Sequence, residues 1–204
     1  MLQAQFIGSQ QQAENSWLIQ LESAQAQSWP IGTQFRVQDQ QAWLFQAPQK
    51  SGQHRFNLLS DQAWLYHPHQ HLDLQIITEK HRSEPNWQAN QLWLASDLAI
   101  AAVFDAAKRW QQLSTPKGQF IALLHTHNDS FPFRVKPARF LLPLNNSAAY
   151  AIGAAPLLED WQIPNRLASS TGIIGCFEGS LEELYQAWLS ANQNPLEGFE
   201  INWI

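Results

Sequence analysis

The chain has 204 residues, a net charge of −5 and 45% hydrophobic residues, a composition typical of one large globular domain or two small ones. The acidic balance argues against a general nucleic-acid binder, and the single Cys excludes an internal disulfide and a Cys-based zinc site. No stretch of 18 apolar residues is present, and residues 1–9 lack a basic segment, so we expect a cytoplasmic protein without a membrane span or secretory signal.

Glutamine takes the place of charge in this chain. Charged residues make up only 14%, whereas Gln occurs 26 times, 20 of them before residue 92. Residues up to about 90 consist of short aromatic and branched runs, several alternating apolar with polar side chains, separated by Pro and Gly. This pattern predicts antiparallel strands in a small barrel or sandwich. The expected strands are 17–21, 34–37, 42–45, 55–59 and 72–77.

The second half has a different hydrophobic pattern, in which short apolar strands alternate with helices. A strand at 91–95 is expected to lead into a helix over 98–113 that Ser96 and Asp97 cap. The apolar run at 120–124 is typical of a parallel strand that is covered on both faces. Further strands are expected at 139–143, 151–153, 165–169 and 199–204, with helices at 155–161 and 182–191. The alternation predicts a doubly wound parallel α/β domain over residues 89–204, after an antiparallel barrel domain over residues 1–88.

Several motifs resemble those of the ferredoxin reductase family, whose members bind FAD and NAD(P). The segment Gly32-Thr-Gln-Phe35 resembles the turn before the family's flavin-binding strand. The segment beginning at Leu92 resembles the first strand and helix of its nucleotide domain. The stretch from Ile163 to Leu181 resembles the strand and Gly-x-x-Gly loop near the end of that domain. Within the family, the electron-transfer subunit of bacterial dihydroorotate dehydrogenase looks most similar.

The resemblance implies a set of cofactor-binding positions. Trp43 and Phe45 stand where the family has its flavin-stacking aromatic residue. The nucleotide would contact three further places in the second half, at the ends of its strands. These are Ser96 and Asp97, Thr126, and the loop glycines Gly172 and Gly175.

The same positions depart from the family's motifs. The segment Gln41 to Pro48 lacks the Arg and the Ser or Thr that contact flavin in the family. Ser96 and Asp97 replace a glycine-rich loop, and an Asp at a helix N-terminus repels phosphate. One Cys cannot hold an iron–sulfur cluster, so that cofactor is excluded. The sequence identifies no catalytic residue and no metal site.

Four other features of the sequence could carry chemistry. His67, His69 and His71 fit either a metal site or, as we favour because Pro68 interrupts the strand, a polar turn. For the segment His125 to Asp129 we favour a polar loop over a ligand-contacting one. The basic segment Arg134 to Arg139 fits a phosphate or acidic partner as well as it fits a rigid connection. Cys176 is expected to be a small buried residue.

Two functions remain open on this basis. The resemblance implies a flavin- and nicotinamide-linked reductase component that passes electrons to a redox partner. The alternative is a cofactor-free scaffold that keeps the fold and docks a protein partner, which the ten Trp residues favour because Trp is enriched at interfaces.

Overall fold

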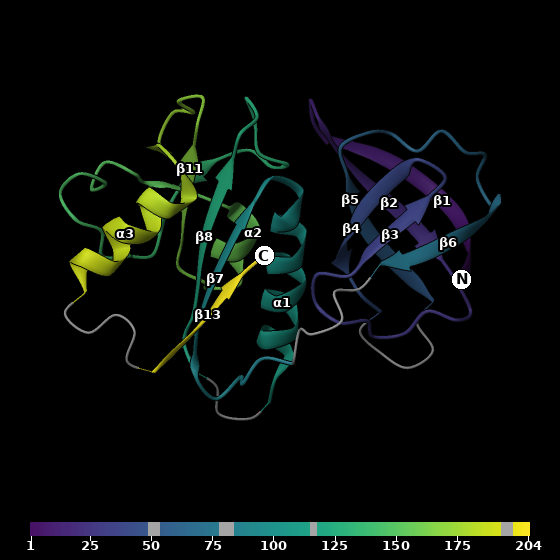
Figure 1. Cartoon of the computed structure of the whole chain (residues 1–204), viewed down its shortest axis with the longest axis horizontal. Coiled ribbons are helices and arrows are strands. Elements are labelled where there is room, and N and C mark those ends of the chain that lie inside the picture. The colour runs from purple at the N-terminus through teal and green to yellow at the C-terminus, as the bar shows by residue number, and fades with distance from the viewer. Residues whose placement is uncertain (49–53, 78–83, 115–117, 193–197) are drawn as a thin grey trace.

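The computed structural model describes the whole chain except residues 49–53, 78–83, 115–117 and 193–197. A closed β barrel lies beside an α/β half, and helix α1 (Ile100–Gln112) stands between the barrel and the second sheet (Figure 1). No helix in the described ranges is long and apolar enough to cross a membrane.

Six antiparallel strands form the barrel, in the order β1-β2-β5-β4-β3-β6. They are β1 (Leu2–Ala13), β2 (Ser16–Glu22), β3 (Gln34–Val37), β4 (Gln40–Gln46), β5 (Arg55–Ser60) and β6 (His71–Ile77). Five of them match the predicted strands. The sixth, β1, closes the barrel by pairing with both β2 and β6, and it was not predicted from the sequence.

Period-2 alternation places apolar side chains inside the barrel and glutamines outside. Along the first half of β1, Leu2, Ala4 and Phe6 are buried, while Gln3 between them is exposed. The barrel core also contains a cluster of Trp29, Phe35 and Phe56, whose ring centroids lie 5.0 to 5.6 Å apart. Neutral amide side chains, and not charged ones, therefore form much of the barrel surface that contacts water.

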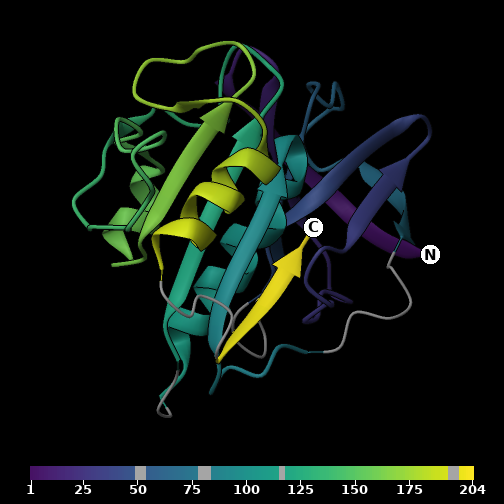
Figure 2. The same ribbon diagram turned by 60° about the vertical axis from the view of Figure 1, so that its left-hand side comes forward.

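The second half contains a parallel sheet in the order β12-β11-β8-β7-β13. Its strands are β7 (Asn90–Ser96), β8 (Phe120–Thr126), β11 (Asn165–Ser169), β12 (Phe177–Glu178) and β13 (Phe199–Trp203). Helices α1 and α2 (Pro156–Asp160) share one apolar core with one face of the sheet, and α3 (Leu181–Ala191) packs on the other face (Figure 2). The predicted fold class, an antiparallel barrel followed by a doubly wound α/β half, is confirmed.

The predicted strand at 139–143 is wrong. Pro143 has no N–H to donate, and the backbone N–H of Arg139 bonds the Glu159 carboxylate at 2.7 Å instead of a neighbouring strand. Two short antiparallel strands lie nearby, β9 (Lys136–Pro137) and β10 (Gly153–Ala154).

A buried ion pair on α1 joins the two halves. Asp105 is 2% exposed, and its carboxylate accepts a hydrogen bond from the backbone of Ala47 at 3.2 Å. Arg109, one turn further on, pairs with Asp105 at 2.6 Å and donates to the carbonyl of Trp29, also at 2.6 Å. Ala47 and Trp29 belong to the barrel core, so α1 is fixed against the barrel by polar contacts as well as apolar ones.

Candidate functional site

The two aromatic side chains expected to stack on flavin face the α/β half. Trp43 and Phe45 lie on the outward side of β4, both half-buried, and both pack against the core that contains α1. The Phe45 ring centroid lies 5.4 Å from that of Phe104 on α1. The surface on which a flavin ring would stack is therefore partly covered by the chain's own side chains.

A small apolar cleft remains beside Phe45. Its volume is about 230 Å³, and none of its described lining residues is charged. The lining consists of Gln12, Leu18, Phe45, Leu59, Phe104, Pro132, Phe133, Pro156 and Leu157. Sites for drug-sized ligands usually measure roughly 300–1,000 Å³, so this cleft is too small for a whole dinucleotide.

Gln41, in the segment where the family has a phosphate-binding Arg, is neutral and already hydrogen-bonded. Gln41 stands opposite Arg36 of β3 in the barrel register, and its amide bonds the side chain of Gln34. Arg36 lines a different surface pocket together with Asp73 and Gln75. The described residues around Trp43 and Phe45 thus do not fit FAD as the resemblance implies it.

A second group of polar side chains gathers at the carboxyl edge of the parallel sheet. β7 ends with Ser96 and continues into the short helix η1 (Asp97–Ala99). The neighbouring strand β8 ends with His125 and Thr126, and β11 ends with Ser169. Parallel strands place such ends together, and this edge is where open α/β sheets bind ligands. We call the group formed by Ser96, Asp97, His125, Thr126, His127, Asn128 and Ser170 the carboxyl-edge cluster.

Asp97 stands at the start of the first helix of this half. Its φ of +53° is a left-handed conformation that Asp tolerates better than most residues. Its carboxylate accepts hydrogen bonds from the backbone N–H of His127 at 2.9 Å and from the ring Nδ1 of His127 at 2.8 Å. Thr126 and Asn128 each donate to it at 3.3 Å.

These contacts hold Asp97 in its charged form. Partial burial raises the pKa of its carboxyl. The hydrogen bonds and charge of His127, together with the hydrogen bond from Thr126, outweigh burial and bring the pKa below its usual value. A carboxylate here lies at the helix N-terminus, where the helix dipole would otherwise favour a pyrophosphate, and its negative charge repels that group. The residues at this edge therefore do not fit NAD(P) bound through its phosphates either.

His125 is 1% exposed, and its ring centroid lies 4.4 Å from that of His127. Its Nδ1 lies 3.2 Å from the Ser96 hydroxyl and its Nε2 lies 2.9 Å from the Ser170 hydroxyl. Burial lowers the pKa of the His125 imidazole, the neighbouring charge of His127 lowers it further, and Asp97 partly opposes both. The ring is therefore neutral near pH 7. Because Ser96 bonds His125, its side chain does not cap η1 as the sequence predicted.

The predicted loop glycines follow β11. Gly172 and Gly175 both have left-handed backbones, with φ of +75° and +84°. Thr171 donates from its hydroxyl to the carbonyl of Asn128 at 3.1 Å, which holds this loop beside the loop after β8. Gly175 accepts a hydrogen bond from Gly153 of β10 at 2.7 Å.

The structure thus divides the predicted cofactor residues between two places. Ser96, Asp97 and Thr126 belong to the carboxyl-edge cluster, with Gly172 on the adjoining loop. Trp43 and Phe45 lie at the contact between barrel and α1. Ser170 and its contact with His125 were not predicted from the sequence. Ser170 follows directly after the strand predicted at 165–169, and a polar side chain at the carboxyl end of a parallel strand was the signal that could have indicated it.

The histidines of the barrel are exposed. His67 and His69 lie in a turn before β6, where His69 has a φ of +64°, and His71 begins the strand. No group of three or more His, Cys, Asp or Glu side chains in the described parts of the chain is placed to hold a metal ion.

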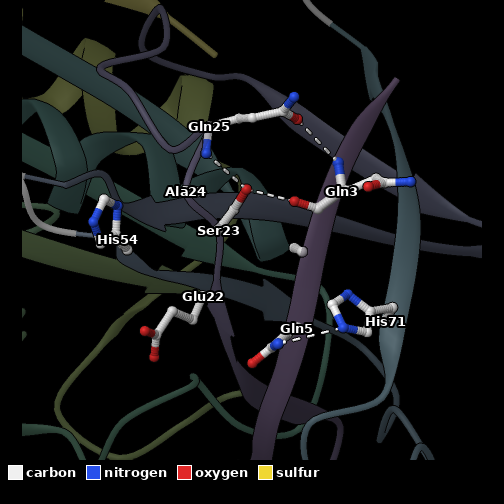
Figure 3. Close-up of a pocket in the computed structure, with 9 residues that line it drawn as sticks. Gln3, Gln5, Glu22, Ser23, Ala24, Gln25, His54 and His71 are labelled. Atoms are coloured by element: carbon white, nitrogen blue, oxygen red, sulfur yellow. Dashed lines mark hydrogen bonds between the residues drawn. The ribbon is translucent and has the colours of Figure 1, made fainter.

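His71 also borders a polar pocket of about 420 Å³ on the outside of the barrel (Figure 3). Ser23 and Gln25 bond the backbone of Gln3 across this pocket, and the Gln5 amide lies 3.3 Å from the His71 ring. Most of the polar groups that line it are therefore already engaged with one another.

The basic segment and the cysteine have separate surroundings. Arg139 pairs with Asp160 at 2.5 Å, whereas Arg134 and Lys136 are exposed. Cys176 is buried, as expected, and burial raises the pKa of its thiol to about 11. A thiol with such a pKa is a poor nucleophile near neutral pH.

Comparisons with known proteins find likeness in the fold. No protein-family profile matches the chain, and no curated protein sequence matches it. A ferredoxin-NADP+ reductase from Plasmodium falciparum shares 10% identity over 99% of this chain and 83% of its own, with a TM-score of 0.65. A ferredoxin reductase in carbazole 1,9a-dioxygenase shares 8% identity, with a TM-score of 0.64, over 99% of this chain and 60% of its own.

A third solved structure is an NADH-dependent reduced ferredoxin-NADP oxidoreductase studied for flavin-based electron bifurcation. It shares 8% identity over 93% of this chain and 64% of its own, with a TM-score of 0.62. The chain thus spans less than two thirds of the length of this protein and of the carbazole dioxygenase reductase. The comparisons establish that the chain has the ferredoxin reductase-like fold.

Proposed function

We propose that this protein keeps the ferredoxin reductase-like fold as a binding scaffold and carries neither FAD nor NAD(P) as a resident cofactor. The observation that carries the proposal is the contact of Trp43 and Phe45 with the core around α1. These side chains would have to leave that core, or a flavin ring would have to fit the cleft of about 230 Å³ beside Phe45. Gln41 is neutral, so it offers the flavin phosphate no charge where the family has an Arg.

The carboxyl-edge cluster supports the same proposal from the nucleotide side. The Asp97 carboxylate is held by His127 at the place where a pyrophosphate would approach the first helix. A phosphate there would have to displace these hydrogen bonds and overcome charge repulsion. In this proposal the ligand of the scaffold is a protein partner, since exposed Arg134 and Lys136 offer charges that the described residues do not pair.

The competing function is the reductase component implied by the resemblance, including its likeness to the dihydroorotate dehydrogenase subunit. The shared fold favours it, because all three compared structures are ferredoxin-linked reductases or oxidoreductases. In that case FAD, NAD(P) and a protein redox partner would be the ligands.

A titration separates the two functions. The purified protein is titrated with FAD, FMN and NADPH, and tryptophan fluorescence is followed, since Trp43 lies at the expected flavin position. We expect no saturable quenching up to about 1 mM of each ligand, which corresponds to binding weaker than roughly −4 kcal/mol. Saturation in the micromolar range by a flavin would overturn the proposal.

Two variants locate any binding that occurs. Under the reductase alternative, Trp43→Ala and Phe45→Ala both weaken flavin binding. Cys176→Ser is the control that leaves it unchanged, because Cys176 lies in the α/β core and not in the cleft beside Phe45.

A further inference from the structure

The contact between Ser170 and His125 has the geometry of a nucleophile and its general base. The Ser170 hydroxyl lies 2.9 Å from Nε2 of His125, within the range over which an imidazole takes a hydroxyl proton. Ser170 itself is exposed, whereas His125 is almost completely buried. The nucleophile is thus accessible and the base is shielded from water.

The second ring nitrogen of His125 has a partner as well. Nδ1 lies 3.2 Å from the Ser96 hydroxyl at the end of β7. In the tautomer with its proton on Nδ1, the ring donates to Ser96 and presents a free lone pair on Nε2 to Ser170. Serine, histidine and an orienting group are the three parts of a nucleophilic catalytic unit, here with a neutral hydroxyl in the third role.

We propose that Ser170 is a nucleophile activated by His125 and oriented through Ser96, and that it accepts acyl groups from uncharged esters. This activity goes beyond the proposed scaffold function and does not depend on it. Ester chemistry fits because it needs a nucleophile and a base but no cofactor. Uncharged substrates fit because the Asp97 carboxylate disfavours anions in the same cluster.

The reaction balances with an ester and water. The Ser170 oxygen bonds the ester carbonyl carbon while its proton passes to Nε2 of His125. The ester's carbon–oxygen bond then breaks, and the alcohol leaves with that proton. Water attacks the acyl group on Ser170 in the same manner, which releases the acid and restores the hydroxyl.

The loop that follows Ser170 is open at Gly172. Among the residues that the structure describes, no heavy atom outside the immediate chain lies within 4 Å of where a Cβ on Gly172 would stand. The loop is nevertheless fixed, because the backbone N–H of Ser170 bonds the carbonyl of Thr126 at 3.1 Å and Thr171 bonds Asn128.

The test is covalent labelling with a fluorophosphonate, which bonds the activated oxygen and loses fluoride. The full chain is incubated with the probe, and the modified residue is located by mass spectrometry of its peptides. We expect one phosphonate per chain, on Ser170. Labelling should fall to background in Ser170→Ala, an exposed position where the change is expected to leave the fold intact.

Three further variants separate activation from mere exposure. Ser147→Ala is the matched control, since Ser147 is also exposed but its hydroxyl bonds the Asn145 amide oxygen at 2.6 Å; its labelling rate should equal that of the parent protein. His125→Gln should lower the rate at least about 100-fold, as loss of a general base does. Ser96→Ala should lower it up to about tenfold, the equivalent of one neutral hydrogen bond.

Two outcomes would overturn the proposal. One is a parent protein that takes up no probe although it is folded by circular dichroism. The other is labelling that persists in Ser170→Ala. If the buried His125→Gln variant does not fold, the thiol introduced by Ser170→Cys replaces it: its alkylation by iodoacetamide should exceed that of the buried Cys176 and should slow in Ser96→Ala.

Discussion

Replacing Asp105 tests how strongly α1 is fixed to the barrel. In Asp105→Ala the Ala47 N–H loses its acceptor, and Arg109, whose side chain is only 18% exposed, loses its main counter-charge. Breaking a buried pair by removing one partner costs about 3–5 kcal/mol. Arg109 keeps the carbonyl of Trp29 and a longer contact of 3.8 Å with Glu84, so we expect the lower end, about 3 kcal/mol.

Urea denaturation followed by tryptophan fluorescence measures this loss, and thermal unfolding should show a fall of about 6–12 °C for a chain of this length. Asp160→Ala is the matched control. Asp160 and Arg139 approach to 2.5 Å but are 64% and 60% exposed, so the loss should be about 0–1 kcal/mol. If both variants lose the same small amount, the buried pair does not hold the two halves together.

The raised pKa of Asp105 predicts in which direction the folding stability changes with pH. Burial raises the pKa of its carboxyl above the ordinary 3.8, although Arg109 and the Ala47 N–H oppose this. The stability that Asp105 contributes is therefore full below the unfolded pKa and declines as pH rises through the folded one. Relative to the always neutral Asp105→Asn, the parent protein should lose stability as pH is raised from about 4.

Three other predictions concern the second half. Burial and the charge of His127 lower the pKa of His125 below the ordinary 6.5, and Asp97 partly opposes them. Phosphonate labelling of Ser170 should therefore persist below pH 6.5 and be lost only at lower pH. In His127→Asn this loss of labelling should occur at higher pH, because a charge that lowers the pKa of His125 is removed. Cys176, with a pKa of about 11, should react with a disulfide reagent at pH 8 far more slowly in the folded than in the urea-unfolded protein, and equal rates would contradict its burial. Gly118→Ala should destabilise the protein by roughly 2–4 kcal/mol in the same urea assay, since the new methyl would stand 2.1 Å from the Ala89 carbonyl oxygen; no change would show that the backbone can shift there.

Hydrophobic patterning predicted most of the fold. Strands β2 to β6 and the parallel strands β7, β8 and β11 alternate or concentrate apolar residues clearly enough to be identified. Strand β1 alternates too, with Leu2, Ala4 and Phe6 buried, but its second half runs Ser-Gln-Gln-Gln, which has no apolar face. The predicted strand at 139–143 fails for the opposite reason: its apolar residues suggest a ladder that Arg139 and Pro143 do not form.

The site was predictable only in its parts. Ser96, Asp97 and Thr126 were identified through the family resemblance, at the ends of the strands that it matched. Their contacts with His127, His125 and Ser170 join residues 29 to 45 positions apart, and these depend on the strand order of the sheet. Resemblance placed Trp43 and Phe45 at a flavin, but whether an outward aromatic residue meets a ligand or a helix is decided by how the two halves pack.

The absorption spectrum of the protein as purified tests the central claim most directly, because a bound flavin is visible without any added reagent. The account predicts a colourless protein with no flavin released on denaturation. A yellow protein that releases close to one flavin per chain would contradict it and would favour the reductase function instead.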